Sequence, residues 1–524
     1  MPSSNTSRSR AVVGLSYLGF ISQALCAPAT GNVQTCCLSL PEALSSTVAL
    51  PAGAAYKSSI ESYWARGEQE LVPSCILRPQ TAEDVSSAIQ HLVANSCQFA
   101  VRGGGHSAGT GWANIQNGVT IDLQALNSTS VSADGSTVSV GAGQRLGNVF
   151  SALYERGLYV GGARASGIGA AGSTMGGKHT CARSIPPPVA KNETKSIPSG
   201  GVGYLYPKTG FAADSVAEYQ VVLANGTIVQ ANKSTNSDLW RALPGGGSNF
   251  GVITNIVYDT IPLGDIWGGD VVWSSDSIAG LAQAFYDFAA NPSYDPDTAV
   301  MMSYHWSPTD GNIIDNQFIY AKPAAKPAAF SGFYNVSGMV VDTATVTNIP
   351  AMSEAQNARS PSGFQQITFS TSYKNNVDVL KDVYNIFNAT IASVSNIDGV
   401  SFSLSLEPLP QAFAAASAAK GGNMMGLDIP PEGVVVTLLS LTFSNAADYP
   451  AMDKLSENLL AQIDAAAAKR GASFGFIEMN HAKSSQKVLQ SYGSRNLDFL
   501  RATAKNYDST SVFQNLMPGG FKLC

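Results

Sequence analysis

The chain has 524 residues, of which 44% are hydrophobic, 9% are aromatic and 13% are charged, and its formal net charge is −6. This length exceeds what one hydrophobic core organises, so we expect two or three globular domains. The mild acidic charge and the lack of a long basic run argue against a nucleic-acid-binding protein.

The N-terminus has the pattern of a secretory signal peptide. Arg8 and Arg10 precede an apolar stretch that ends in the small residues Ala27-Pro28-Ala29. Because this stretch is too short for a typical membrane span, we predict a signal peptide over residues 1–28 and a secreted or secretory-pathway protein. A buried N-terminal helix is the alternative, and no later segment is predicted to cross a membrane. Glycosylation sequons that agree with secretion start at Asn127, Asn225, Asn232, Asn335 and Asn388.

Four of the seven cysteines precede residue 100 and follow the predicted signal peptide. In an oxidising compartment we expect one or two disulfides among Cys36, Cys37, Cys75 and Cys97. Our preferred pair joins Cys97 to Cys36 or Cys37, which would tie an N-terminal arm (residues 29–66) to the rest of the chain. No cysteine pair has the spacing of metal ligands, and we predict no metal site.

The residues after the arm alternate short strands with helices, which predicts an α+β fold. Thr81 starts a capping pattern, and the apolar residues after it recur at helical spacing up to Asn95. A hairpin is predicted to turn at Asn225-Gly226. The other predicted elements are strands at 98–101, 119–123 and 137–140 and a helix at 144–156.

The segment Arg102-Gly103-Gly104-Gly105-His106-Ser107 follows one of these strands. Three consecutive glycines lack a Cβ, so their backbone can turn sharply and bring N–H groups close to a bound anion. Arg102 adds a positive charge for phosphate, and His106 lies where it could touch, or be bonded to, a phosphate-bearing cofactor. A tight turn beside a surface histidine is the alternative.

Two further glycine-rich segments occupy residues 164–177 and 244–254. In the first of them, Ser173 and Thr174 can donate hydrogen bonds to phosphate oxygens. None of the three segments fits the spaced glycines and later acidic residue of a Rossmann fingerprint, and the lysine of a Walker motif is missing. Three glycine loops joined to strand-like sequence favour a ligand site over three independent turns.

The second half of the chain predicts an antiparallel sheet with helices on one face. We expect the substrate on the other face, and the excess of aromatic and apolar residues over charges favours a neutral organic molecule. The predicted strands lie at 271–273, 299–304, 317–320 and 434–443, and the helices at 277–290, 376–393 and 449–470.

The three glycine segments and a closing segment over residues 492–515 together resemble the FAD-linked oxidases of the vanillyl-alcohol oxidase type. The similarity is to the berberine-bridge-enzyme-like branch, which includes fungal secondary-metabolite and oligosaccharide oxidases, and it covers nearly all of the mature chain. It implies a two-subdomain PCMH-type FAD-binding domain over residues 67–263, a substrate domain over 264–480 and a C-terminal segment over 481–524 that returns to the FAD domain.

The resemblance implies that FAD is the cofactor and that His106 bonds covalently to the flavin 8α-methyl group. Such a bond withdraws electron density from the flavin and raises its potential. Many relatives add a second bond from a cysteine, but Ala165 stands at that position, so we expect one covalent bond. The other residues that the resemblance implies for FAD binding are Arg102, Gly103, Gly104, Gly105, Ser107, Gly169, Gly172, Ser173, Gly176, Gly177, Asn249, Gly251, Val252, Ile253, Tyr492 and Asn496.

The catalytic base is expected where relatives carry a Tyr-x-Asn-Tyr motif, which here reads Glu478-Met479-Asn480-His481. Glu478 therefore replaces the tyrosine that is often the base. A partly desolvated Glu478 could have a raised pKa and act as the base, and His481 could do so near neutral pH. The alternative is that both are ordinary polar residues at a strand end. His305 is a weaker candidate for the substrate face, or else a packed strand residue.

Residues 178–200 interrupt the second glycine segment. They are polar and proline-rich, and their removal joins Gly177 to Gly201-Val202-Gly203-Tyr204, the run that the family pattern expects. We interpret the segment as an intron retained in the gene model, because Gly177-Lys178 can be encoded with a GTAAG donor and Ser199-Gly200 with a CAG acceptor in the same phase. A genuine surface loop is the alternative.

The function that the resemblance implies is an FAD-dependent oxidase in secondary-metabolite biosynthesis. It would take hydride from an organic substrate to the flavin, which dioxygen would reoxidise with release of hydrogen peroxide. The alternatives are a carbohydrate or oligosaccharide oxidase and an inactive flavin-binding relative. We expect a monomer whose partners are a small organic substrate and dioxygen.

Overall fold

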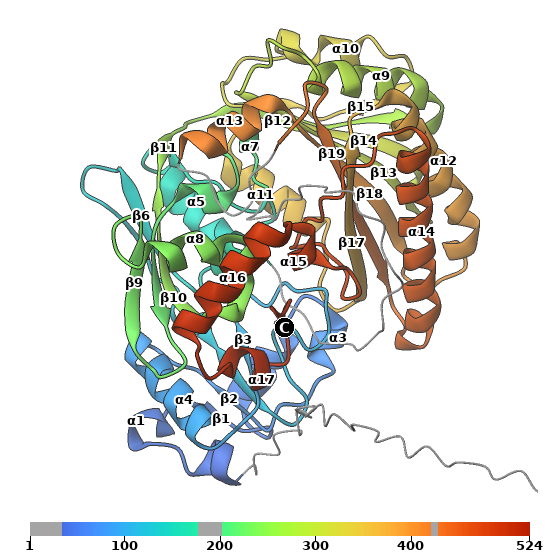
Figure 1. Cartoon of the computed structure of the whole chain (residues 1–524). Helices are drawn as coiled ribbons and strands as arrows, with labels where there is room; N and C mark the ends of the chain where they lie inside the picture. Colours follow the sequence, from blue (N-terminus) through green and yellow to red (C-terminus); the bar gives the residue numbers. More distant parts are fainter. Residues whose placement is uncertain (1–33, 177–201, 421–427, 524) are drawn as a thin grey trace, which may run out of the picture.

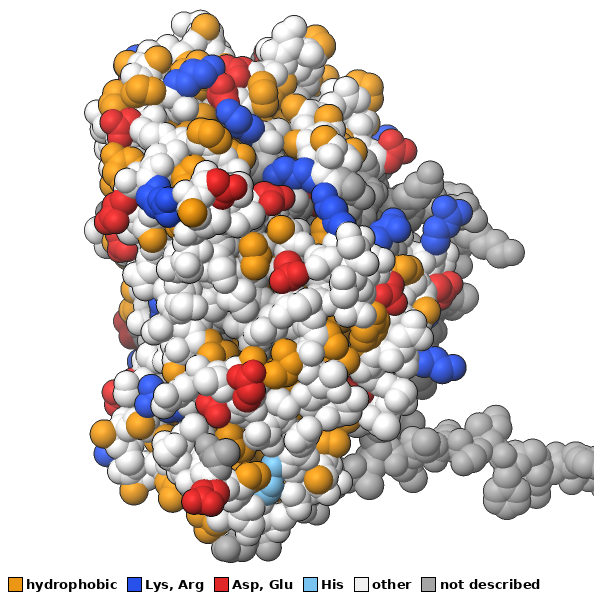
Figure 2. Space-filling model, turned by 90° about the vertical axis from the view of Figure 1, so that its left-hand side faces the viewer, with side chains coloured by type: hydrophobic (Ala, Val, Ile, Leu, Met, Phe, Trp, Pro, Cys, Tyr) orange, Lys and Arg blue, Asp and Glu red, His pale blue; other side chains and the backbone are white. Residues whose placement is uncertain are grey.

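The computed structural model describes residues 34–176, 202–420 and 428–523 (Figure 1). The predicted signal peptide, Gly177 and the interrupting residues 178–200 lie outside the described residues. Within the described ranges, no helix combines the length and the apolar character needed to cross a membrane. On the face shown in Figure 2, charged side chains of both signs are scattered among uncharged ones.

The first sheet ends at the glycine segment that contains His106. Its order is β1-β2-β4-β3, and because β2, β4 and β3 run parallel, their carboxyl ends share the edge from which residues 102–107 emerge. Helix α4 starts at the predicted cap, where Thr81 accepts a hydrogen bond from the amide of Asp84. The elements of this region are α1 (Glu42–Ser45), β1 (Val48–Ala49), α2 (Ala54–Glu61), α3 (Arg66–Gln69), β2 (Cys75–Leu77), α4 (Ala82–Ala94), β3 (Phe99–Arg102) and β4 (Val119–Asp122).

The second sheet is antiparallel, with the order β5-β6-β10-β8-β9. The hairpin predicted at Asn225-Gly226 is confirmed: it joins β8 to β9, and Gly226 has a φ of +82°, a conformation that glycine adopts without strain. The elements are β5 (Thr129–Val131), β6 (Thr137–Gly141), α5 (Leu146–Tyr154), β7 (Leu158–Tyr159), α6 (Ala170–Met175), α7 (Tyr206–Thr209), β8 (Val216–Val222), β9 (Ile228–Asn232), α8 (Ser237–Gly246), β10 (Val252–Asp259) and β11 (Ile261–Pro262).

The third sheet has eight antiparallel strands in the order β15-β12-β14-β13-β18-β19-β17, with β16 paired to β12. Helices α12 and α14 lie along its outer side in Figure 1, and the predicted fold class is thereby confirmed. The elements are β12 (Ile266–Ser274), α9 (Ile278–Ala289), β13 (Thr298–Ser307), β14 (Gly311–Tyr320), α10 (Ser331–Tyr334), β15 (Met339–Asp342), β16 (Thr345–Thr347), α11 (Ile349–Ala358), β17 (Gln365–Lys374), α12 (Val377–Val394), β18 (Ser401–Leu409), α13 (Gln411–Ala419), β19 (Val434–Phe443) and α14 (Tyr449–Lys469).

The face of this sheet opposite the helices carries polar side chains. That the substrate lies on this face stays a prediction. Along β18, Phe402 and Leu404 are buried in the core beneath the helices, whereas Ser403 and Ser405 point to the opposite side. The hydroxyl of Ser405 bonds that of Ser303 on β13 at 2.9 Å. The apolar residues of these strands thus pack into the core, and the hydroxyl groups lie on the other face of the sheet.

The C-terminal segment returns to the first two sheets. Helix α16 (Ser494–Tyr507) packs beside α8, between α15 (Val488–Ser491) and α17 (Val512–Asn515), as Figure 1 shows. The amide of Phe99 in β3 donates to the carbonyl of Leu516 at 2.9 Å. The limits of the arm and domains, at residues 66, 263 and 480, stay predictions.

Two disulfides fasten the N-terminal arm to the first sheet. Cys36 is bonded to Cys97 next to β3, and Cys37 is bonded to Cys75 in β2. The expectation of disulfides in this cluster is confirmed, and the partner of Cys97 is Cys36. Other residues of the same arm, further along the chain, contact the His106 loop.

Replacing Cys36 and Cys97 together by serine should lower the free energy of unfolding by about 2–4 kcal/mol, because the disulfide restricts the unfolded chain. Urea unfolding of the double variant and the unmodified protein measures the difference. An unchanged free energy of unfolding would contradict the bond between these two residues.

Candidate functional site

Two of the predicted segments touch through their glycines. A Cβ added to Gly104 would lie 2.4 Å from the amide nitrogen of Gly169, and a Cβ added to Gly169 would lie 2.5 Å from that of Gly104. Side chains do not approach a backbone this closely, so both positions require glycine. Gly105 has a φ of +72°, which also favours glycine. The first and second segments therefore meet in backbone contact beside His106.

His106 presents a free ring nitrogen next to this contact. Its imidazole stacks on the indole of Trp64, with 4.4 Å between ring centres and 12° between the planes. Its Nε2 atom is buried and has no hydrogen-bond partner among the described residues. Burial, together with the positive charges of Arg145 and His481, lowers the pKa of His106 to about 4. A neutral imidazole with an unpartnered buried nitrogen fits a residue that bonds to a cofactor.

Arg102 shapes the loop. Its guanidinium is buried, lies 3.6 Å from the carboxylate of Asp122 and donates to the hydroxyl of Ser59 at 3.0 Å. It also packs 3.9 Å from the centre of the Tyr63 ring. A Cβ on Gly105 would lie 2.7 Å from the Nε of Arg102, so the guanidinium packs against the glycine turn. The charge expected to meet phosphate is balanced by Asp122, and the contact of Arg102 with FAD stays a prediction.

Glu478 and His481 form a hydrogen-bonded pair in a turn outside any strand. Nδ1 of His481 lies 2.8 Å from Oε2 of Glu478, and the amide of Glu478 donates to the hydroxyl of Ser370 on β17. The side chain of Glu478 is 2% exposed, whereas that of His481 is 45% exposed. Burial by itself lowers the pKa of His481, but the carboxylate of Glu478 outweighs it, with help from Glu407, and the pKa of His481 is raised.

A buried ion pair joins the second glycine segment to the third sheet. Arg164 donates to Oε1 of Glu407 on β18, and their side chains are 9% and 3% exposed. The other carboxylate oxygen, Oε2 of Glu407, is buried without a hydrogen-bond partner in the described part of the chain. The charges of Glu407 and Arg164 both act on the pKa of His481. Ionic groups from the second glycine segment, the third sheet and the C-terminal turn therefore converge.

The remaining predicted residues of the first two segments differ in their surroundings. The hydroxyl of Ser107 is buried and lacks a partner among the residues described. Gly169 precedes α6, and Ser173 donates to its carbonyl at 3.0 Å, so this hydroxyl is used within the helix. Gly172 is exposed, with open space where a Cβ would stand among the described residues, and Gly176 has a φ of +73°.

The third segment is tied to the C-terminal return. The side-chain amide of Asn249 donates to the carbonyl of Phe521 at 2.7 Å, and Tyr492 donates to the carbonyl of Gly245 at 2.9 Å. Gly251 packs so closely on β8 that a Cβ would lie 2.4 Å from a methyl of Val221. The other predicted residues here are Val252 and Ile253 in β10 and Asn496 in α16. Their contacts with FAD stay predictions.

Sequence reasoning missed several residues of this region, because tertiary contacts alone bring them there. Trp64 lies in the N-terminal arm, far along the chain from His106, and no local pattern marks it. Arg145 donates to the carbonyl of Gly167 at 2.9 Å. Glu407 carried one signal: it is the single charge in an alternating serine and leucine run. His305, the weaker candidate, bonds Ser403 at 2.7 Å on the polar sheet face.

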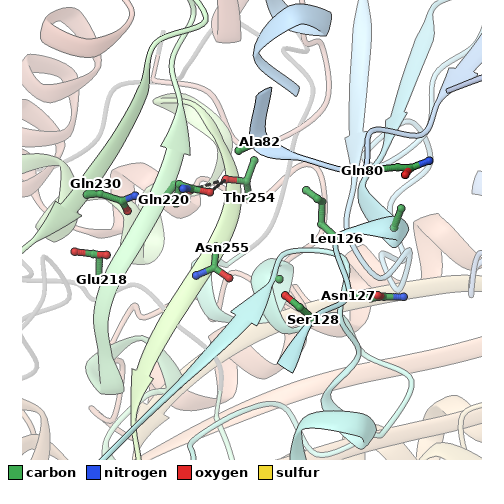
Figure 3. Close-up of a pocket in the computed structure, with 12 residues that line it drawn as sticks. Gln80, Ala82, Leu126, Asn127, Ser128, Glu218, Gln220, Gln230, Thr254 and Asn255 are labelled. Atoms are coloured by element: carbon green, nitrogen blue, oxygen red, sulfur yellow. Dashed lines mark hydrogen bonds between the residues drawn. The ribbon is translucent and has the colours of Figure 1, made fainter. Parts of the chain in front are cut away.

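Two cavities lie in different parts of the molecule. The larger, of about 340 Å³, lies against the polar face of the second sheet (Figure 3), where Gln220 bonds Thr254 and the sequon residue Asn127 borders it. It contains no predicted site residue. The smaller, of about 210 Å³, is lined by Ala108 and Gly109, which follow His106, and by Ala482 and Lys483, which follow His481. This cavity adjoins the predicted site.

Comparison with known proteins gives a consistent result. A family model described as an FAD binding domain matches residues 73–185. The chain is 30% identical over 503 residues to the FAD-dependent monooxygenase drtC of Aspergillus calidoustus, covering 94% of this chain and 90% of that protein. It is 29% identical over 497 residues to the bifunctional solanapyrone synthase of Alternaria solani, covering 94% and 90%.

A solved structure with the same fold is the glucooligosaccharide oxidase of Acremonium strictum. It is 17% identical, with a TM-score of 0.69, over 92% of this chain and 98% of that one. The FAD of that oxidase is described as 6-S-cysteinyl, 8α-N1-histidyl.

Substituting Gly104 by alanine should destabilise the protein by about 1–3 kcal/mol and abolish FAD binding, because the new methyl group would force the two segments apart. Gly264→Ala is the matched control: this glycine is exposed, with open space where a Cβ would stand among the described residues. Thermal unfolding and FAD titration measure both variants. Equal behaviour of the two would contradict the contact.

The pKa of His106 should lie below that of an ordinary histidine, and the pKa of His481 should lie above it. In FAD-free protein labelled at its five histidines, NMR titration should give His106 a pKa of about 4 and His481 a raised one. Glu478→Gln should lower the pKa of His481, because the removed carboxylate favours the charged imidazole. If both histidines of the unmodified protein have ordinary pKa values, the burial of His106 and the pairing of His481 with Glu478 are contradicted.

Proposed function

Since the chain belongs to the FAD-dependent oxidoreductases of fungal secondary metabolism, we propose that it is an oxidase with FAD bonded covalently to His106. It takes hydride from an organic substrate, and dioxygen is the final electron acceptor. The observation that carries the proposal is the buried, unpartnered Nε2 of His106 beside the paired glycine segments. Covalent attachment also agrees with the histidyl FAD described for the Acremonium oxidase.

Attachment through one bond follows from the second glycine segment. Ala165 is buried, 4% exposed, and its methyl side chain has no nucleophile. A second bond at this position needs a thiolate. His106 is therefore the single tether that we propose, and Gly104, Gly169 and Arg102 hold it in place.

His481 is the proposed general base, and Glu478 orients it. If Glu478 is ionised, it can only accept, so Nδ1 of His481 carries the proton of their hydrogen bond and Nε2 is left to take a proton from the substrate. The buried carboxylate also stabilises the imidazolium that forms. Glu407 and Arg164 add a charge pair near this ring.

Bound FAD would supply the two-electron acceptor for this chemistry. For an alcohol, the hydroxyl proton moves to Nε2 of His481 and the carbon-bound hydrogen leaves as hydride. The net reaction converts the alcohol and dioxygen into a carbonyl compound and hydrogen peroxide, so atoms and electrons balance.

A carbohydrate or oligosaccharide oxidase is the second candidate. The bonded hydroxyls of Ser303 and Ser405 and the His305–Ser403 pair make the sheet face rich in hydrogen-bonding groups. Such a face suits a substrate with several hydroxyl groups. A peroxide-release screen of sugars against hydroxylated polyketide-type alcohols discriminates the two candidates.

Entry into the secretory pathway is part of the proposal. The two disulfides support it, since such bonds persist in oxidising compartments. The sequons at Asn127, Asn225, Asn335 and Asn388 lie at exposed positions, where glycans could be accommodated. The predicted cleavage after residue 28, a monomeric state and the retained-intron origin of residues 178–200 stay proposals, the last tested by sequencing the mature transcript.

Acid denaturation should leave flavin attached to the unmodified protein and release it from His106→Ala, because the substitution removes the bonding nitrogen. Flavin fluorescence of the protein band on a denaturing gel measures this. His305→Ala is the control and should retain its flavin. Both the full chain and one lacking residues 178–200 should be compared. Flavin that washes out of the unmodified protein would disprove covalent attachment.

Glu478→Gln and His481→Gln should each slow flavin reduction by substrate about 10²–10⁴-fold, the usual contribution of general base catalysis. Flavin content should stay unchanged, because neither residue is proposed to bond the cofactor. Anaerobic stopped-flow bleaching of the flavin measures the rate. Reduction at the unmodified rate in both variants would exclude the pair as base, and an absence of peroxide release with every substrate would favour the inactive relative.

A further inference from the structure

Trp64 stacks on His106, and the function proposed above assigns this residue no role. The two rings are nearly parallel, 12° apart, with centres separated by 4.4 Å. The amide of Trp64 also donates to the carbonyl of Gly105 at 3.0 Å. Both the side chain and the backbone of this arm residue therefore hold the loop that carries His106.

The substrate domain holds Trp64 from the other side. Nε1 of the indole donates to the carbonyl of Ser360 at 3.1 Å, and the carbonyl of Trp64 accepts from the amide of Gly363 at 2.9 Å. The neighbouring Arg66 donates through Nε to the carbonyl of Gly363 at 2.7 Å. The loop over residues 360–364, which leads into β17, thus fixes the indole that supports the imidazole.

We propose that Trp64 is a positioning residue for covalent flavin attachment: it orients the imidazole of His106 toward the flavin 8α-carbon, and the loop over residues 360–364 holds it in place. The inference rests on the proposed covalent bond at His106. A stacked indole limits rotation of the imidazole about its side-chain bonds, so the attacking nitrogen keeps one direction.

Covalent attachment is a two-electron oxidation, and dioxygen is the acceptor of these electrons. An imidazole nitrogen forms a C–N bond to the 8α-carbon while one C–H bond of that methyl group breaks. The proton of that C–H bond and the N–H proton of the imidazole are both lost. The two electrons left on the flavin pass to dioxygen, which takes up two protons and becomes hydrogen peroxide.

Because the indole covers one face of the imidazole, we infer that it also limits the access of water to this ring. Attack needs the neutral ring, and burial keeps the pKa of His106 low, so the neutral form persists into acid. The charged groups that act on His106 are Arg145, which precedes α5, and His481, in the C-terminal turn; the guanidinium of Arg102 packs against the adjacent Gly105. None of these charged groups belongs to the N-terminal arm. Replacing Trp64 therefore changes the hydration of the His106 imidazole without removing a charge.

The test measures the rate at which flavin becomes covalently attached to the protein, and it does not depend on substrate turnover. Full-length protein produced under riboflavin limitation is mixed with FAD, and acid-stable flavin and intact mass are followed over time. Trp64→Phe, which keeps a ring but loses the Ser360 bond, should attach flavin within about threefold of the unmodified rate. Trp64→Leu should be about tenfold slower, equivalent to about 1.4 kcal/mol in the barrier.

The pH dependence of flavin attachment distinguishes a positioning role of Trp64 from a general loss of structure. Attachment to Trp64→Leu should be lost at about pH 5.5 and recover at about pH 8, because a hydrated imidazole has a pKa closer to the ordinary value. The unmodified protein should attach flavin at both. Trp240→Leu is the matched control, a tryptophan whose Nε1 donates to Val216 in the second sheet, and it should behave as the unmodified protein.

The outcomes distinguish this inference from the proposed function. If the unmodified protein binds FAD only reversibly, the covalent proposal fails and the inference falls with it. If the unmodified protein attaches flavin and Trp64→Leu does so at the same rate and pH range, the inference alone is wrong. Should Trp64→Leu not fold, Trp64→Met decides: slower attachment supports the role of the stacked indole, and an unchanged rate overturns it.

Discussion

The backbone contact between Gly104 and Gly169 is the constraint on which the rest of the site depends. It brings the end of the first sheet against the turn that precedes α6, with no room for a Cβ on either side. His106 follows this contact directly, so the direction of its imidazole is set by the packing of two loops that are distant in sequence. Arg102 behind Gly105 and Trp64 against the ring complete the support.

Each buried charged side chain considered in this region has a partner of opposite charge. Arg102 is paired with Asp122, Arg164 with Glu407, and Glu478 with His481. Burying an ion pair costs desolvation energy that the attraction between the charges only partly offsets, so such pairs are weak evidence for stability. The value of the Arg164–Glu407 pair is geometric, because it joins the second glycine segment to the third sheet. Its two charges, together with the carboxylate of Glu478, also act on the pKa of His481.

The sequence predicted much of the fold because its patterns are local. The cap at Thr81, the hairpin at Asn225-Gly226 and the glycine segments are each encoded within a few residues. Strands β17 and β18 were missed because serines and threonines on the polar sheet face alternate with the buried apolar residues and mask the strand signal. Trp64 and the partner of Arg164 could not be predicted, since each depends on packing between domains. The sequence named Glu478 and His481 as separate candidates for the base, and the structure adds that the turn between them brings them into hydrogen-bond contact.

The central claim is that one residue, His106, bonds the flavin. Mass spectrometry of the proteolytic peptide that contains His106, taken from protein purified with its flavin, tests it most directly. The account predicts that this peptide carries the mass of FAD less two hydrogens, with fragment ions that place the addition on the imidazole. An unmodified His106 peptide from yellow protein, or the addition on another residue, would contradict it.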